Sequence, residues 1–156
     1  MVARIAVLTF VLCTQTLPTM LSAQTSIPYT EGSVWGLNLL RIKSGRGDDY
    51  VNDVRASLKR QLDEAKRQGL LLSYKFISTD AVNATDWNML LMVEYKNMAA
   101  LDGLREKMDP IASRTVGSPE ERRDRALKRN DIREVIGTKL GRELILRDSL
   151  PERANR

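Results

Sequence analysis

Short apolar stretches alternate with longer amphipathic ones between residues 33 and 147. Segments 33–43, 70–78 and 87–96 are rich in branched and aromatic residues, which is typical of β-strands. A shorter segment of the same kind, residues 142–147, lies near the end of the chain. The pattern therefore predicts four strands.

Three segments between these strands have helical spacing of apolar residues. Residues 48–68 place apolar side chains three or four positions apart, and Gly69 can stop this helix. A second helix is expected after Asn97, and Pro110 is expected to kink or end it. A third is predicted over residues 118–136, where Ser-Pro-Glu-Glu supplies an N-cap, an N-terminal proline and a capping glutamate.

The predicted order is β-α-β-β-α-α-β. Two right-handed β-α-β crossovers that interleave give one antiparallel sheet with its helices on one face. The sequence therefore predicts an α+β chain with the ferredoxin-like arrangement and one added helix. This domain is expected to span residues 33–147.

Both faces of the predicted sheet are apolar. In segment 87–96, Leu91 and Val93 point to one face, whereas Leu90 and Met92 point to the other. Helices on one face leave the other uncovered, and a large exposed apolar surface promotes association. We therefore expect a homodimer in which two copies pack sheet against sheet around a two-fold axis.

The segments 69–78 (GLLLSYKFIS) and 86–104 (DWNMLLMVEYKNMAALDGL) resemble the dimeric α+β barrel superfamily. That superfamily includes antibiotic-biosynthesis monooxygenase, EthD-like and NIPSNAP-like domains, and the chain also resembles exported bacterial proteins of unknown function. The resemblance covers roughly residues 34–147 and implies a dimeric α+β barrel. Its haem-binding members use a histidine ligand, which this chain lacks.

The N-terminal 23 residues have the pattern of a secretory signal peptide. Arg4 provides a positive start, a nine-residue, largely apolar stretch follows (residues 5–13), and Ala23 is a suitable cleavage site. Residues 24–32 are expected to be a flexible leader, and residues 148–156 a disordered tail. The mature chain is expected to be exported to the periplasm or the outside, without a transmembrane segment.

Composition narrows the possible chemistry. The chain has no histidine and one cysteine, Cys13, which falls within the predicted signal. Histidine-dependent triads, cysteine nucleophiles and the usual zinc sites are therefore not expected, and neither a metal nor a cofactor is predicted. The net charge of +5 is mild, and residues 120–134 mix both signs, so no nucleic-acid partner is expected.

Candidate ligand-binding residues are the polar and aromatic side chains within or beside the predicted strands: Trp35, Asn38, Tyr74, Trp87 and Asn88. The tryptophans could stack on a flat ligand or pack in a core or interface. The amide of Asn38 could bind a ligand carbonyl or satisfy a neighbouring group. Glu94 could be a base with a raised pKa or an exposed ion-pair partner.

Three functions fit this pattern. The first, which we favour, is a small exported homodimer that binds an apolar or aromatic small molecule in its barrel. The second is a cofactor-independent oxygenase or isomerase of a phenolic or quinone-like substrate. The third is an envelope interaction protein that docks a partner through the charged helix at residues 118–134, with Arg122, Arg123 and Arg125 as contacts. No catalytic residue is assigned.

Overall fold

A single antiparallel sheet forms the base of the molecule. The structure is a computed structural model, and it describes residues 27–148. Its sheet has the order β2-β3-β1-β4. The strands are β1 (Tyr29–Ile42), β2 (Ser73–Ser78), β3 (Met89–Tyr95) and β4 (Arg133–Leu146). This order confirms the predicted α+β, ferredoxin-like topology. The sheet of the single chain is open and does not close into a barrel.

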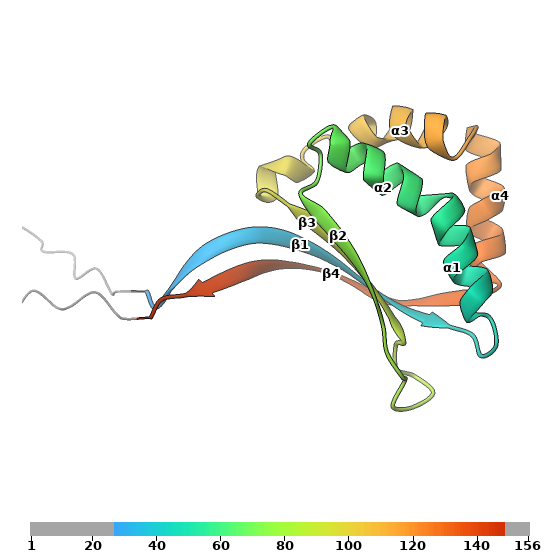
Figure 1. Cartoon of the computed structure of the whole chain (residues 1–156), viewed down its shortest axis with the longest axis horizontal. Coiled ribbons are helices and arrows are strands. Elements are labelled where there is room, and N and C mark those ends of the chain that lie inside the picture. Colours follow the sequence, from blue (N-terminus) through green and yellow to red (C-terminus); the bar gives the residue numbers. More distant parts are fainter. Residues whose placement is uncertain (1–26, 149–156) are drawn as a thin grey trace, which may run out of the picture.

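Helices lie over one face of this sheet (Figure 1). They are α1 (Gly47–Ala56), α2 (Leu58–Arg67), the 3-10 helix η1 (Met98–Leu101), α3 (Leu104–Thr115) and α4 (Pro119–Asn130). The strand residues beneath them form the core, because cross-strand partners such as Leu40 and Met89 point to the same face. Along residues 27–148, no helix is long and apolar enough to cross a bilayer.

The predicted helix over residues 48–68 is interrupted at Ser57. There the backbone leaves helical geometry (φ −126°, ψ −76°), so α1 ends and α2 begins at Leu58. The Ser57 side chain is buried, and its hydroxyl donates to the carbonyl oxygen of Asp53 at 2.7 Å. A serine hydroxyl that bonds its own backbone competes with the helix. Apolar periodicity does not register this break, because it continues through both helices.

The predicted helix over residues 118–136 ends early. Ser118 forms the expected capping box with Glu121, which confirms its start, but α4 stops at Asn130. Residues 133–136 belong instead to β4, which has 14 residues rather than the predicted six. Pairing with β1 along almost its whole length outweighs the local helical pattern.

Two other boundaries differ from the sequence prediction. β1 begins at Tyr29, so residues 29–32, expected in the leader, are part of the sheet. The helix after Asn97 divides into η1 and α3, and Pro110 lies inside α3 without ending it. The residues after Pro110, Ile111 and Ala112, are buried, and this packing holds the last turns of α3. The predicted signal peptide and most of the predicted tail lie outside the described residues.

β1 and β4 continue beyond the rest of the sheet as a two-stranded ribbon, here called the arm (residues 29–33 and 143–146). Figure 1 shows the arm leaving the helical end of the molecule, with both ends of the described chain at its tip. Tyr29 pairs with Leu146 there, whereas β3 pairs with β1 only from Val34 onwards. Leu144, Ile145 and Leu146 are exposed on the arm.

Candidate functional site

An apolar cavity of about 300 Å³ lies between α1, the start of α2 and strands β2 and β3. We call it the α1–β2 cavity. It exists because β2 is an edge strand, so α1 has no further strand beneath its outer side. Its walls are almost entirely apolar carbon, with two cationic side chains among the lining residues. The lining residues are Tyr50, Val51, Val54, Arg55, Lys59, Tyr74, Phe76 and Met89.

The tyrosine Tyr50 is the most deeply buried side chain of this cavity, with 1% of its surface exposed. Its hydroxyl has no hydrogen-bond partner within residues 27–148, and neither has the nearby buried Nε of Arg133. The Arg133 guanidinium carbon lies 5.9 Å from the Tyr50 ring centroid, within cation–π range. Burial raises the pKa of Tyr50 above its usual 10.0, and the charge of Arg133 opposes part of this rise.

A second tyrosine of the cavity, Tyr74, has a hydrogen-bonded hydroxyl group, unlike Tyr50. Its hydroxyl donates to Asp63 Oδ1 at 2.5 Å, and Lys59 Nζ donates to Asp63 Oδ2 at 2.5 Å. These two bonds lower the pKa of Asp63, with the Lys59 bond contributing more. Burial, followed by the bond to Asp63, raises the pKa of Tyr74. The three side chains therefore form a fixed polar edge at the α2 end of the cavity.

A second cavity of about 390 Å³ adjoins the first, and both contact Val51 and Met89. It lies between the loop that precedes α1 and the neighbouring ends of β2 and β3, and Asn88 is among its lining residues. The Asn88 side chain is already engaged. Its Oδ1 accepts from the Ile42 N–H at 2.7 Å, and its Nδ2 donates to the Ile42 carbonyl at 3.0 Å.

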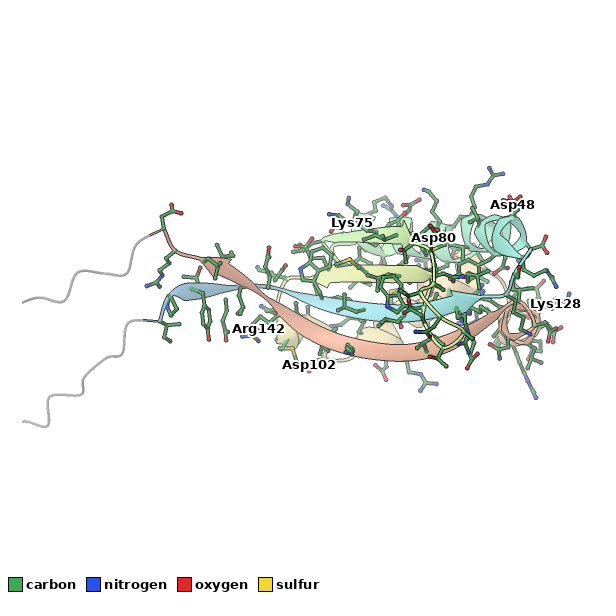
Figure 2. All side chains as sticks on the ribbon, turned by 90° about the horizontal axis from the view of Figure 1, so that it is seen from below. Asp48, Lys75, Asp80, Asp102, Lys128 and Arg142 are labelled. Carbon is green, nitrogen blue, oxygen red and sulfur yellow. The ribbon has the colours of Figure 1, made fainter. Side chains whose placement is uncertain are left out.

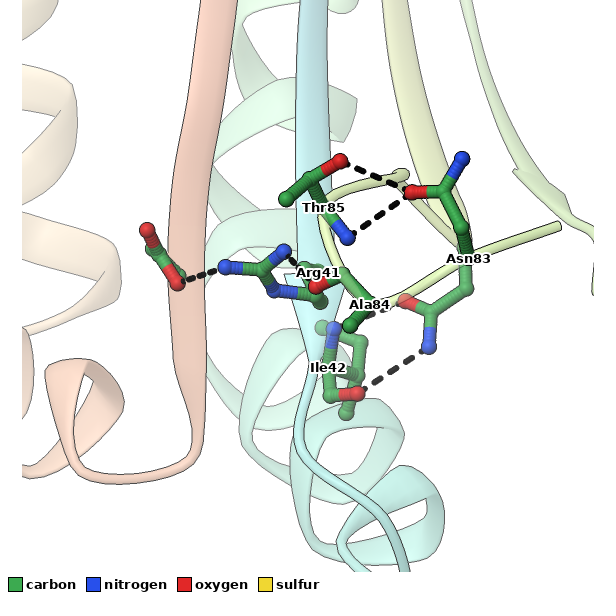
Figure 3. A network of polar contacts seen from close by, with 7 residues as sticks. Arg41, Ile42, Asn83, Ala84 and Thr85 are labelled. Carbon is green, nitrogen blue, oxygen red and sulfur yellow. Dashed lines mark hydrogen bonds and ion pairs between the residues drawn. The ribbon is translucent and has the colours of Figure 1, made fainter. Parts of the chain in front are cut away.

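The Asn88 contact adjoins a wider set of polar contacts around the end of β1, here called the brace, in which Figure 3 labels Arg41, Ile42, Asn83, Ala84 and Thr85. Arg41 bridges the carbonyl oxygen of Ala84, in the β2–β3 loop, and the carboxylate of Glu134 on β4. Asn83 Oδ1 accepts from both the backbone N–H and the hydroxyl of Thr85. The brace holds the β2–β3 loop against β1, so Asn88 acts in the described chain as a positioning group.

The five sequence-predicted residues do not meet at one place in the single chain. Tyr74 and Asn88 line the two adjoining cavities. Asn38 is half-buried on the helix side of β1, and its Oδ1 accepts from the Thr138 hydroxyl at 3.2 Å. Trp87 is half-buried in the loop before β3. Trp35 points to the opposite, uncovered face, where it is paired with Glu94.

On that uncovered face, Glu94 accepts a hydrogen bond from the Ser73 hydroxyl. This bond is the main cause that lowers the pKa of Glu94. A lowered pKa is the reverse of what a general base near neutrality needs. The structure therefore argues against the base. Glu94 also differs from the predicted exposed ion-pair partner, because it is half-buried and its partner is the Ser73 hydroxyl.

Most residues that line the cavity are not among the sequence-predicted candidates. One of them, Tyr50, precedes Val54 and Leu58 at intervals of four residues. That spacing places the aromatic ring on the buried face of α1 and was the available signal. Phe76 follows Tyr74 by two residues, which places both rings on one face of a strand. In the structure the two rings form an edge-to-face pair with their centroids 6.1 Å apart.

Comparison with known proteins shows similarity to solved structures and no sequence relative. No protein-family model matches the chain, and no curated protein sequence matches it. Among solved structures, the chain is similar to two dimeric ferredoxin-like proteins from uncultured marine organisms. The first has a TM-score of 0.46 at 13% identity, covering 77% of this chain and 100% of that one. The second has a TM-score of 0.43 at 10% identity, covering 79% of this chain and 95% of that one.

Proposed function

We propose that this protein is a homodimeric module that binds a small apolar or aromatic molecule in the α1–β2 cavity. The observation that carries this proposal is the cavity itself. Its volume of about 300 Å³ is at the lower end of the range for small-molecule sites. Such sites are mostly apolar and contain a few fixed polar groups. In the α1–β2 cavity these groups are Arg55 and the hydrogen-bonded edge of Lys59, Asp63 and Tyr74.

The proposed occupant is planar and aromatic, with at most one acidic group. Phe76 and Tyr74 already make an edge-to-face pair, and a third ring can join such a cluster. Arg55 and Lys59 line the same cavity and would attract one negative charge. The export predicted from residues 1–23 would place this binding activity in the periplasm or outside the cell.

Association into a homodimer is supported by the uncovered face of the sheet. Figure 2 views the sheet from the side opposite the helices, with the four strands next to one another. The apolar side chains on this face are Trp35, Leu37, Leu39, Ile77, Leu90 and Met92. Lys75, Lys139 and Glu94 lie among them, so the face carries both charge signs.

A second copy is the occupant that best fits such a surface. A two-fold axis places each patch against the same patch of the partner, so a surface must complement itself. An apolar centre with both charge signs meets this requirement. Sheet-to-sheet packing of two copies would produce the α+β barrel that the sequence predicted, and the arm would extend alongside the partner.

The interaction hypothesis for the charged helix has less support. Arg122, one of its three proposed contacts, is half-buried and donates to Asp109 of α3. Arg125 remains exposed, although it lines a cavity against the α1–α2 junction. The deeply buried hydroxyl of Tyr50 has no base within hydrogen-bond distance in the described chain, so it adds no support to the alternative of catalysis.

A matched pair of tryptophan substitutions tests the ligand site. Val51 lines the cavity and is 52% exposed, whereas Val82 lies in the β2–β3 loop and is 88% exposed. Val51→Trp would fill the cavity mouth, and Val82→Trp adds the same ring elsewhere. The neutral fluorescent probe N-phenyl-1-naphthylamine would report binding without drawing on cationic side chains.

We expect the parent and Val82→Trp to bind the probe alike and Val51→Trp to bind it at least about tenfold more weakly, a loss of about 1.4 kcal/mol. Circular dichroism would establish that all three proteins keep the same fold. Equal probe affinity in all three folded proteins, or no probe binding by the parent, would contradict the assignment of the cavity.

A further inference from the structure

Three arginines of α4 converge on a separate cavity on the other side of α1. Arg122, Arg125 and Arg129 follow one another at intervals of three and four residues, which places them on one helix face. They line a cavity of about 180 Å³, here called the arginine cavity. Its remaining walls come from the α1–α2 junction and the end of α3: Ser57, Leu58, Gln61, Ala112 and Val116.

The carboxylates within reach do not use all the donors of these arginines. Arg129 donates to Asp53 at 2.6 Å and to the Ser57 hydroxyl at 2.9 Å. Arg125 lies 3.7 Å from the same Asp53, and Arg122 donates to Asp109 at 2.8 Å. In these contacts, three guanidinium groups therefore share two carboxylates.

One of the unused donors is buried. Arg122 Nε has no hydrogen-bond partner within the described part of the chain, although the atom is out of contact with solvent. A buried guanidinium donor without an acceptor is unfavourable, and native structures rarely leave one unsatisfied. An ion-pair network that served only to join α4 to α1 would need Arg129 and Asp53 but not this third arginine.

The backbone adds donors at the same place. α2 begins beside the cavity at Leu58, without a side-chain N-cap and without an acidic residue in its first turn. By contrast, α1 has Asp48 and Asp49 at its start, and α4 has its capping box. The uncapped N–H groups and the helix dipole favour a negative charge at the start of α2. No acidic side chain of its first turn supplies this charge, and the side chains across the cavity are arginines.

We propose that the arginine cavity is a binding site for a phosphate group, either free phosphate or the end of a phosphate monoester. A guanidinium group can donate two parallel hydrogen bonds to phosphate oxygens. Three guanidinium groups and the N-terminus of α2 together supply positive charge and enough donors for the four oxygens of a phosphate group. The volume of about 180 Å³ holds a phosphate with a small organic remainder. The bound group would accept from guanidinium N–H groups of the three arginines that line the cavity and link α4 to the start of α2.

This site is independent of the α1–β2 cavity. The two lie on different sides of α1 and α2 and have no lining residue in common. Phosphate binding can therefore fail while apolar ligand binding holds, and the reverse. The protein would then bind two chemically different ligands at two separate sites.

Calorimetric titration of the folded protein with inorganic phosphate and with phenyl phosphate tests the proposal, with sodium chloride at matched ionic strength as the salt control. The test variants are Arg122→Gln and Arg125→Gln. Arg123→Gln is the matched control, because Arg123 is exposed on the same helix and does not line the cavity. Arg125→Gln is included because Arg125 is more exposed than Arg122, so its replacement disturbs folding less.

We expect one phosphate per chain, with affinity reduced about tenfold or more in both test variants and by less than about twofold in Arg123→Gln. Binding of both phosphate compounds would identify a site for phosphate monoesters, and binding of inorganic phosphate alone would identify a site for the free ion. Absence of a heat of binding for either compound would overturn the proposal. Equal weakening in Arg123→Gln would also overturn it.

Discussion

Arg129 donates from Nε to Asp53 Oδ2 at 2.6 Å and so connects α4 to α1 across 76 positions of sequence. The two side chains are 15% and 22% exposed, so water screens this ion pair only in part. The same guanidinium also donates to Ser57, at the break between α1 and α2. One arginine therefore holds the last helix against the point where the first helical segment changes direction.

Replacing Arg129 by alanine should destabilise the protein by about 2 kcal/mol, because Asp53 loses its shortest partner while remaining mostly buried. Urea unfolding followed by circular dichroism would measure the change. Arg123→Ala on the exposed side of α4 should alter the free energy of unfolding by less than about 0.5 kcal/mol. Equal effects of the two substitutions would show that the Arg129 contact contributes nothing.

The two cavity tyrosines should respond differently to loss of their hydroxyl groups. Tyr50→Phe removes a buried hydroxyl that has no partner in the described chain, so stability should stay within about 0.5 kcal/mol of the parent or increase. Tyr74→Phe removes the bond to Asp63 and should cost up to about 1 kcal/mol. Chemical denaturation would compare them. A larger loss for Tyr50→Phe would mean that its hydroxyl has an acceptor in solution.

The homodimer can be tested on the uncovered sheet face. Leu37 lies on this face opposite Met92, so Leu37→Lys places a charge at the centre of the proposed interface. Sedimentation velocity should show a dimer for the parent and a monomer for this variant, because a desolvated, unpaired charge opposes association. Val82→Lys, in an exposed loop, is the control and should remain dimeric. A monomeric parent would contradict the proposed homodimer.

Acid stability should depend on Glu64 of α2. Hydrogen bonds from Arg67, and then from Gln68, lower the pKa of Glu64 from 4.5 to about 2. A carboxyl group whose pKa is lower in the folded state stabilises it above the unfolded pKa and loses this contribution as the pH falls. The window is therefore between pH 4.5 and about 2.

The measurement is the free energy of unfolding across that window for the parent, Glu64→Gln and Asp80→Asn. We expect the stability of Glu64→Gln to fall less steeply with decreasing pH than that of the parent, because the glutamine cannot be protonated there. Asp80→Asn changes an exposed loop carboxyl group and should keep the slope of the parent. Identical slopes for the parent and Glu64→Gln would show that this group is not linked to folding.

The sequence by itself determined the elements whose signals are local. The Ser118 and Glu121 capping box started α4 as predicted, and the order of strands and helices led to the ferredoxin-like topology. Consecutive apolar residues in the strands also predicted two apolar sheet faces, because successive side chains along a strand point to opposite faces.

Only the tertiary structure decided the features that depend on distant partners. Residues 133–136 have apolar positions that suit a helix, yet β1 offers them a strand partner and they become part of β4. Ser57 interrupts a helical pattern that runs unbroken through it, and its hydroxyl is held by Arg129, far along the chain.

The candidate sites also depend partly on local sequence and partly on tertiary packing. Tyr74 was selected from sequence because an aromatic residue in a strand is visible there, but Trp35, which had the same signal, points to the other face of the sheet. The α1–β2 cavity exists because α1 overhangs an edge strand, and the arginine cavity because α4 lies against the α1–α2 junction. Periodicity specifies which face of an element is apolar, whereas the spaces between elements arise only when those faces pack.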